Sequence, residues 1–190
     1  MKRIAFVLSA LIVCAGLSGC KSKPSMDSDK TIFDYMQEEV AKISRKGGMA
    51  SVGIGESRNT SLAITRAKVE ARKNLAQLVQ VKIENLEKAF IEEIGEASGS
   101  EINQLFSSAT KQITSQTLQG TQPIEQEYDI NDGITTAYVL MVLNPDVIHE
   151  SLKNNNAKHL YERFRASKAF EELDKEIKEF EAAELRGASL

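Results

Sequence analysis

The chain has 190 residues, and its 24 Lys and Arg residues are slightly outnumbered by 27 Asp and Glu residues, giving a formal net charge of −3. This mixed, mildly acidic composition argues against a nucleic acid partner, because nucleic acids attract basic surfaces. The sequence has no Trp and few other aromatic residues, which also argues against a stacking platform for bases or sugars.

Residues 1–16 have the pattern of an export signal. Lys2 and Arg3 supply positive charge, and an uncharged, mostly apolar run extends from Ile4 to Gly16. This order is typical of a secretory leader. The alternative is an uncleaved membrane anchor, but the run is shorter than the roughly 20 residues that a spanning helix needs. Without the two charges of the leader, the net charge becomes −5.

The segment Leu17-Ser18-Gly19-Cys20 lies where apolar residues give way to polar ones. It resembles the lipobox of bacterial lipoproteins, in which leucine and small residues precede an obligatory cysteine. That resemblance implies cleavage between Gly19 and Cys20, a diacylglycerol on the Cys20 thiol, and an acyl chain such as palmitate on the new amino group. Two or more acyl chains hold a protein stably at a membrane. The alternative, a disulfide, has no intrachain partner because Cys14 leaves with the leader.

Residues 20–30 are expected to form the lipidated Cys20 followed by a flexible tether. The tether is predicted because the segment after Cys20 is polar and contains Pro24. In lipoproteins of the proteobacterial sorting system, Asp directly after the cysteine retains the protein at the inner membrane. Lys21 occupies that position here. The resemblance therefore implies the outer membrane.

A helix is predicted after the tether, because apolar residues from Ile32 to Ile43 recur at helical spacing. Asp29 is the candidate cap, and Gly47-Gly48 is the stop. The alternative role, a helix lying on the membrane surface, fits less well because the polar face is acidic.

Residues 49–57 alternate between apolar and small side chains, which predicts a short strand. Gly53 and Gly55 share one face of this strand. Missing side chains at such positions allow another element to approach closely. We therefore expect Gly53 and Gly55 to be packing glycines.

A long helix follows, from Ser61 to about Ile94, with Asn59-Thr60 as its cap and small alanines near its start. At about 1.5 Å per residue it would be on the order of 50 Å long. A small core cannot cover that length, so the helix must bend or its far end must pack on another helix or subunit.

A second helix is predicted after the glycine-rich break, with Ser98 and Glu101 as a capping box and Gly120 near its end. Residues 123–143 predict a hairpin, because Asp132-Gly133 separates two β-rich arms. Asn144-Pro145 then opens a short helix.

The last segment, from Lys158, predicts one charged helix, partly exposed or forming an antiparallel arm. The expected fold class is α+β, in the order strand, helix, helix, hairpin and helix, with this charged helix at the periphery. The expected divisions are residues 1–19, a signal peptide; 20–30, the lipidated tether; 31–156, the α+β module; and 157–190, the charged helix.

Catalytic and cofactor sites lack a supporting pattern. Gly53-Ile54-Gly55 begins like a dinucleotide motif, but Arg58 replaces the third glycine. His149 and His159 are too few for a zinc site, which needs three or four ligands, so we expect surface histidines and no metal.

Two roles are possible for a basic cluster, defined by Lys158, Arg163, Arg165 and Lys168. It could meet anionic lipid or peptidoglycan. Acidic residues in the following turns favour pairing along the helix instead.

The order of lipobox, linker, ASVGIGES and the alanine-spaced helix resembles the LPP-twenty family of outer-membrane lipoproteins. The matching residues cover the central third of the chain; they are Gly53, Gly55, Ala63, Ala67, Ala71, Leu75, Ala76, Val79 and Ile83. The family includes flagellar basal-disc lipoproteins. The resemblance implies a long helix on a small antiparallel sheet, an outer-membrane address and no enzyme activity.

Together these patterns lead us to expect a lipid-anchored, non-catalytic scaffold of the cell envelope, at the periplasmic face of the outer membrane. Its expected partners are the membrane, reached through Cys20, and further copies or envelope proteins, in a flagellar disc for example. No nucleic acid, metal or cofactor is expected beyond the lipid on Cys20. The alternative function is a surface-exposed antigen or adhesin that binds a host or neighbour molecule.

Overall fold

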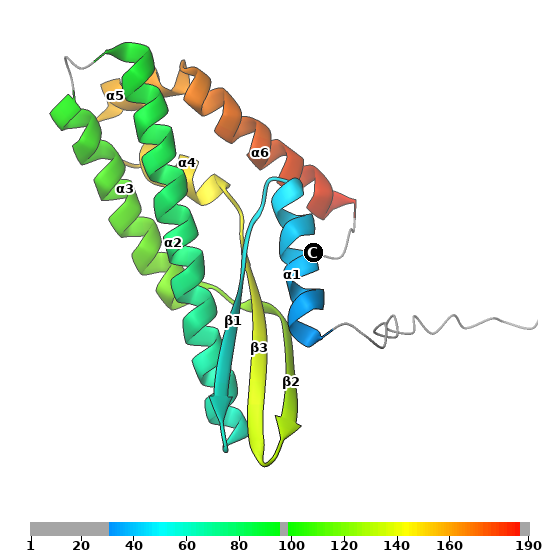
Figure 1. The fold of residues 1–190 in the computed structure, drawn as a ribbon. Coiled ribbons are helices and arrows are strands. Elements are labelled where there is room, and N and C mark those ends of the chain that lie inside the picture. The colour runs from blue at the N-terminus through cyan, green and yellow to red at the C-terminus, as the bar shows by residue number, and fades with distance from the viewer. Residues whose placement is uncertain (1–30, 96–98, 187–190) are drawn as a thin grey trace, which may run out of the picture. The chain divides into compact units, whose positions relative to one another are not determined.

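The computed structural model describes residues 31–95 and 99–186, without the side chains of 117–120. Cys20, the rest of the leader and tether, and the cap predicted at Ser98 lie outside this part of the chain. In chain order, the elements are α1 (Ile32–Arg45), β1 (Met49–Ser57), α2 (Thr60–Ile94), α3 (Gly99–Gly120), β2 (Pro123–Asn131), β3 (Ile134–Leu143), α4 (Asp146–Lys153), α5 (Lys158–Arg165) and α6 (Lys168–Leu185). The predicted α+β class is confirmed, and Figure 1 shows helices packed along the small sheet and grouped beyond one end of it.

The sheet has the order β1-β3-β2, and both neighbouring pairs are antiparallel. In the middle strand, Val139 lies opposite Gly53 of β1, and Ala137 lies opposite Tyr128 of β2. The predicted Asp132-Gly133 turn joins β2 to β3, and both turn residues have positive φ, at 51° and 74°. This conformation follows the right-handed twist of the strands, which explains why Asp-Gly is favoured there.

The first half of α2 covers one face of the sheet. Asn59 caps the helix as predicted, because its side chain accepts a hydrogen bond from the Leu62 backbone N–H at 3.1 Å. The helix then buries one small residue per turn against β1 and β3; these are Ala63, Ala67 and Ala71. Small side chains keep the helix close to the strands.

Helix α1 covers the opposite face of the sheet. Its cap is Thr31 rather than the predicted Asp29, because Thr31 and Asp34 hydrogen-bond each other's backbone N–H in a capping box. Its apolar stripe is buried, with Met36 and Ile43 almost fully inaccessible against the sheet. The stripe therefore packs within the fold, which removes the basis for a membrane-surface helix.

The second half of α2 runs beyond the sheet and packs against α3, as the length of the helix predicts (Figure 1). A second core forms here around three buried rings from α2, α3 and α5, namely Phe90, Phe106 and Phe164. The Phe164 ring meets the other two edge to face, with centroids 5.4 and 5.3 Å away. Such geometry is favourable for aromatic rings beyond their burial.

The C-terminal segment forms two helices where the sequence predicts one. Ala166 ends α5, and Ser167 caps α6 by accepting a hydrogen bond from the Phe170 backbone N–H at 3.3 Å. Helix α6 lies on the outside of the fold in Figure 1. It nevertheless buries Leu173 in the aromatic core and Phe180 against α1 and the sheet. Lys82 of α2 also pairs with Glu176 of α6 at 2.5 Å. Within the described residues, α5 and α6 thus belong to the same compact unit as the sheet.

Candidate functional site

The predicted lipidation site, Cys20 with cleavage after Gly19, lies outside the described residues, so it stays a prediction. The folded unit begins at Thr31, and residues 21–30 separate it from Cys20. Among the described residues, no helix is both long and apolar enough to cross a membrane.

The structure places Gly53 and Gly55 directly under α2. A Cβ atom on Gly53 would lie 2.2 Å from both Ala67 O and Ala71 N, and one on Gly55 would lie 2.3 Å from Ala63 O. Both distances are far inside van der Waals contact with backbone atoms. Glycine is therefore required at these positions by the approach of the helix.

Three side chains fasten α2 to β1 beside this contact. Ser51 Oγ donates to Ala71 O at 2.7 Å, and Asn74 Nδ2 donates to Val52 O at 3.1 Å. Arg66 donates to the carbonyl of Glu56 at 2.5 Å. Among the described strands, β1 pairs with β3 alone. Asn74 and Arg66 therefore occupy carbonyls along the other edge of β1, which hinders pairing with another strand.

A polar cluster on α4 contains His149, which the sequence predicts to lie on the surface. Its side chain is only 23% exposed; Nδ1 lies 3.2 Å from Asp146 Oδ1, and Nε2 lies 2.8 Å from the Tyr161 hydroxyl. A carboxylate only accepts, so in a neutral ring Nδ1 carries the proton and Nε2 accepts from Tyr161. Burial raises the pKa of Tyr161. A phenolic hydroxyl is both a donor and an acceptor, so it can donate to Nε2.

The same cluster brings together three possible metal ligands, Asp146, His149 and Glu150, whose ligand atoms lie within 4.8 Å of one another. Lys153 already donates to Glu150 at 2.8 Å, and this hydrogen bond lowers the pKa of Glu150. All three groups come from one turn of one helix and already have protein partners. We therefore assign the cluster a structural role in joining α4 to α5.

The remaining sequence candidates are exposed. His159 is 69% exposed, with Nε2 3.4 Å from Glu101. The four side chains of the basic cluster are all exposed, and none of them makes an ion pair with another described residue. The predicted pairing along the helix is therefore wrong for these residues. Ion pairs along a helix occur instead in α6, between Lys178 and Asp174 and between Lys175 and Glu179.

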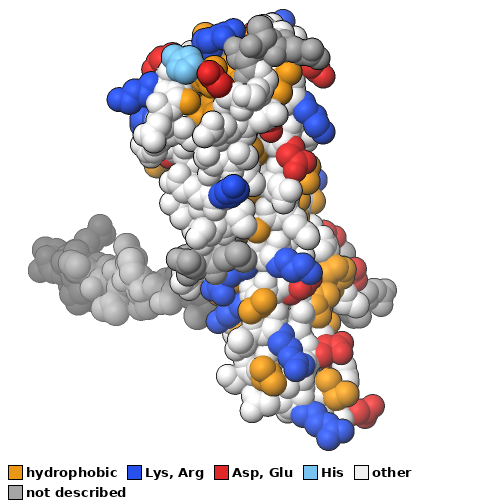
Figure 2. All heavy atoms as spheres, turned by 90° about the vertical axis from the view of Figure 1, so that its left-hand side faces the viewer, with side chains coloured by type: hydrophobic (Ala, Val, Ile, Leu, Met, Phe, Trp, Pro, Cys, Tyr) orange, Lys and Arg blue, Asp and Glu red, His pale blue; other side chains and the backbone are white. Residues whose placement is uncertain are grey.

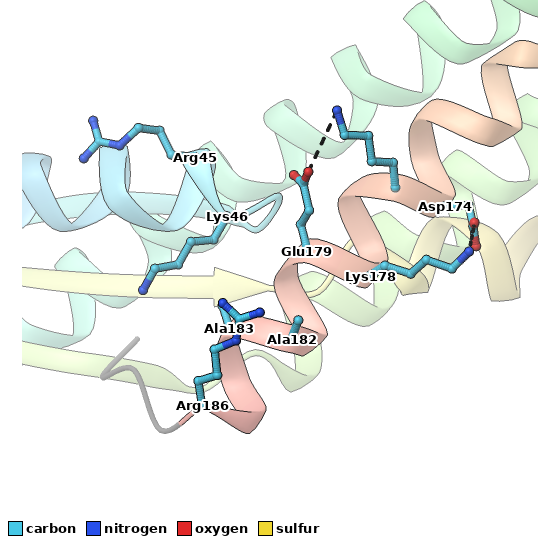
Figure 3. Close-up of a pocket in the computed structure, with 9 residues that line it drawn as sticks. Arg45, Lys46, Asp174, Lys178, Glu179, Ala182, Ala183 and Arg186 are labelled. Carbon is cyan, nitrogen blue, oxygen red and sulfur yellow. Dashed lines mark hydrogen bonds and ion pairs between the residues drawn. The ribbon is translucent and has the colours of Figure 1, made fainter.

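A feature that sequence reasoning missed is an open hollow of about 630 Å³ between the end of α1 and the last turns of α6. Figure 3 shows Arg45 and Lys46 on one side of it and Arg186 at the end of α6. We call this feature the basic hollow. About 140 residues separate Lys46 from Arg186 in the chain, so no local pattern connects them.

Comparison with known proteins adds no relative: no family model, curated protein or solved structure matches the chain. The resemblance to the outer-membrane lipoprotein family therefore depends on the sequence motifs alone.

On the face drawn in Figure 2, hydrophobic side chains lie scattered among charges of both signs.

Proposed function

We propose that this protein is a lipid-anchored, non-catalytic structural module of a bacterial cell envelope. The observation that carries the proposal is the position of Cys20, directly after an apolar leader and small residues. Lipid on this cysteine holds the folded unit at the membrane, since two or more acyl chains give stable attachment.

The scaffolding role is supported by the way in which the folded unit is fastened. One helix, α2, contributes to the core beside the sheet and to the aromatic core beyond it. Small residues fix its position at the sheet, and interlocking rings fix it at the other end. Because α2 is packed at both ends, it holds the sheet and the aromatic core in fixed positions relative to each other, as a structural component requires.

Self-association is supported by apolar side chains on the edge strand β2. Tyr128 and Ile130 are 50% and 56% exposed, and they lie opposite Ala137 and Thr135. On this face of the sheet, α2 packs mainly on β1 and β3 and makes few contacts with β2. A second copy of this chain covers them in the assembly that we propose. A periplasmic disc or ring at the outer membrane is the form suggested by the lipoprotein family that the sequence resembles.

Replacement of Cys20 tests the anchor. In cells, Cys20→Ala should leave the leader uncleaved or release the protein into the soluble fraction, because no sulfur remains to carry lipid. Cys14→Ala is the matched control, since Cys14 lies within the leader and its loss should leave processing intact. Retention of the Cys20→Ala protein in the detergent phase, cleaved normally, would contradict the proposal.

The membrane face is tested separately by protease treatment of intact cells. A protein at the periplasmic face survives this treatment and is digested once the outer membrane is opened. Digestion in intact cells would favour the surface antigen or adhesin instead.

A further inference from the structure

We propose that the basic hollow docks onto the headgroups of anionic phospholipids. This inference deepens the proposed function by naming a second contact with the membrane, and in the cell it rests on the anchor at Cys20. The charges that carry it belong to the folded unit alone.

The hollow is rich in positive charge. It is lined by Arg45, Lys46, Asp174, Lys175, Lys178, Glu179, Ala182, Ala183 and Arg186. Five of these side chains are cationic and two are anionic, a local net charge of +3 in a chain whose total is −3. The local sign is thus opposite to that of the whole protein.

The two acids are already paired within α6. Asp174 pairs with Lys178, and Glu179 lies 3.9 Å from Lys175. Arg45, Lys46 and Arg186 make no ion pair with any residue in the described part of the chain. Figure 3 shows Arg45 and Lys46 at the end of α1 and Arg186 at the end of α6. Arg45 and Arg186 are exposed and Lys46 is half-buried, so an external anion can reach them.

Helix ends alone do not account for this arrangement. A cation near a helix C-terminus is favourable because it faces the negative end of the dipole, and Arg45 and Arg186 both occupy such ends. That effect acts on each helix separately and falls off within one turn. It does not explain why cations from two helices meet in one hollow.

An extended surface fits better than a small soluble anion. A second hollow of about 470 Å³ shares Asp174 and Lys178 with the first, and it adds the cations Lys153 and Arg165. Since Lys153 is paired with Glu150, Arg165 is the cation that extends the positive surface from α6 to α5. An array of headgroups can meet several such sites at once.

The length of the chain is compatible with this contact. The ten residues 21–30 can span at most about 35 Å. Helix α1, with 14 residues, is about 21 Å long. The end of α1 can therefore reach the surface in which Cys20 is anchored.

Binding to vesicles tests the proposal with the mature chain, residues 20–190, carrying Cys20→Ser so that no lipid is attached. We expect this protein to sediment with vesicles of equimolar phosphatidylcholine and phosphatidylglycerol, and not with phosphatidylcholine alone. Added salt should weaken the binding, because it screens exposed charges.

Charge reversal locates the contact. Each basic side chain near an anionic membrane strengthens binding about fivefold, so Lys46→Glu with Arg186→Glu should weaken it at least about tenfold. The matched control, Lys88→Glu with Lys111→Glu, changes the net charge equally at exposed sites on α2 and α3. Its affinity should stay within about twofold of that of the unsubstituted protein. Circular dichroism checks that each variant is folded, and Arg45→Glu alone serves as a milder second test.

Equal loss of binding in both double variants would overturn the proposal, as would no binding to the anionic vesicles. Binding of inorganic phosphate in the hollow without binding to vesicles would overturn the assignment to lipid. Because Cys20 is absent from the test protein, none of these results depends on the anchor. Failure of the anchor would be seen only in the Cys20→Ala experiment in cells.

Discussion

Two glycines determine how closely α2 approaches the sheet. At Gly53 and Gly55 the helix backbone occupies the space that a side chain would need. The facing residues of α2 are alanines, so the contact is made by small groups on both sides. The close approach also places Ser51 and Asn74 within hydrogen-bond distance of the neighbouring backbone.

Gly53→Ala should therefore destabilise the protein strongly. Its Cβ would meet backbone atoms at 2.2 Å, and overpacking of this kind costs about 3 kcal/mol. Urea unfolding measures the difference. Gly99→Ala is the control, because a Cβ there meets nothing within 4 Å. The alanine also lowers the conformational entropy of the unfolded chain, so the stability of this variant should be unchanged or slightly higher. Equal stability of the two variants would contradict the packing role.

The His149 cluster illustrates a residue whose surroundings the sequence does not reveal. Its partners are Asp146 on the same helix and Tyr161 on the next one. Asp146 lies three residues before His149, which is helical spacing, but Tyr161 lies twelve residues after it. The sequence therefore does not indicate the contact with Tyr161. The Phe170 ring also packs against the imidazole, with centroids 5.4 Å apart.

Tyr161→Phe should cost about 1 kcal/mol of stability, because one hydrogen bond between α4 and α5 is lost and the ring is kept. Thermal unfolding measures the loss. Tyr128→Phe is the control, since Tyr128 is half exposed and its change should be nearly neutral. If the Tyr161 variant were as stable as the control, the hydroxyl would contribute nothing to this junction.

At the scale of elements, the helices and strands follow from hydrophobic periodicity and from caps and turns. The start of α2 at Asn59 and the Asp132-Gly133 turn depend on adjacent residues, so the sequence predicts both correctly. The separation of α5 from α6 was missed, because charged residues hide the cap at Ser167. The basic hollow was missed because it joins cations from opposite ends of the chain.

The aromatic core should be the most sensitive junction between elements. Phe164 is fully buried and contacts rings from α2, α3 and α6. Phe164→Ala should reduce stability by about 3–5 kcal/mol, since it removes burial and leaves a cavity. Phe33→Ala, at a side chain that is 36% exposed, should cost much less. Chemical denaturation of both variants gives the comparison, and similar losses would argue against a second core.

At the scale of the whole molecule, we propose that a lipid anchor at Cys20, a compact folded unit and a surface for further copies act together. The fold class could be predicted from the sequence because each element carries its own pattern. The surface proposed for contact with further copies could not be predicted, because the sequence does not show which apolar residues the folded sheet leaves exposed. Tyr128 and Ile130, on the edge strand β2, are two of the large apolar side chains that the fold leaves exposed.

If copies of the chain associate through the edge strand β2, a charged side chain on β2 should weaken the association. Ile130→Lys should shift the mature, unlipidated protein toward monomer, because a charged side chain is costly to bury at an interface. Light scattering over a range of concentrations measures the mass. The control is Leu62→Lys on the exposed side of α2, which should leave the mass unchanged. A wild-type protein that is monomeric at every concentration would remove the support for self-association.

The central claim is that lipid on one cysteine holds this folded unit at the envelope. Intact-mass spectrometry of the protein purified from its native membranes tests that claim most directly. We predict a chain that begins at Cys20 and carries the added mass of a diacylglycerol, with or without a further acyl chain. A bare thiol at Cys20, or a chain that retains its leader, would contradict the account.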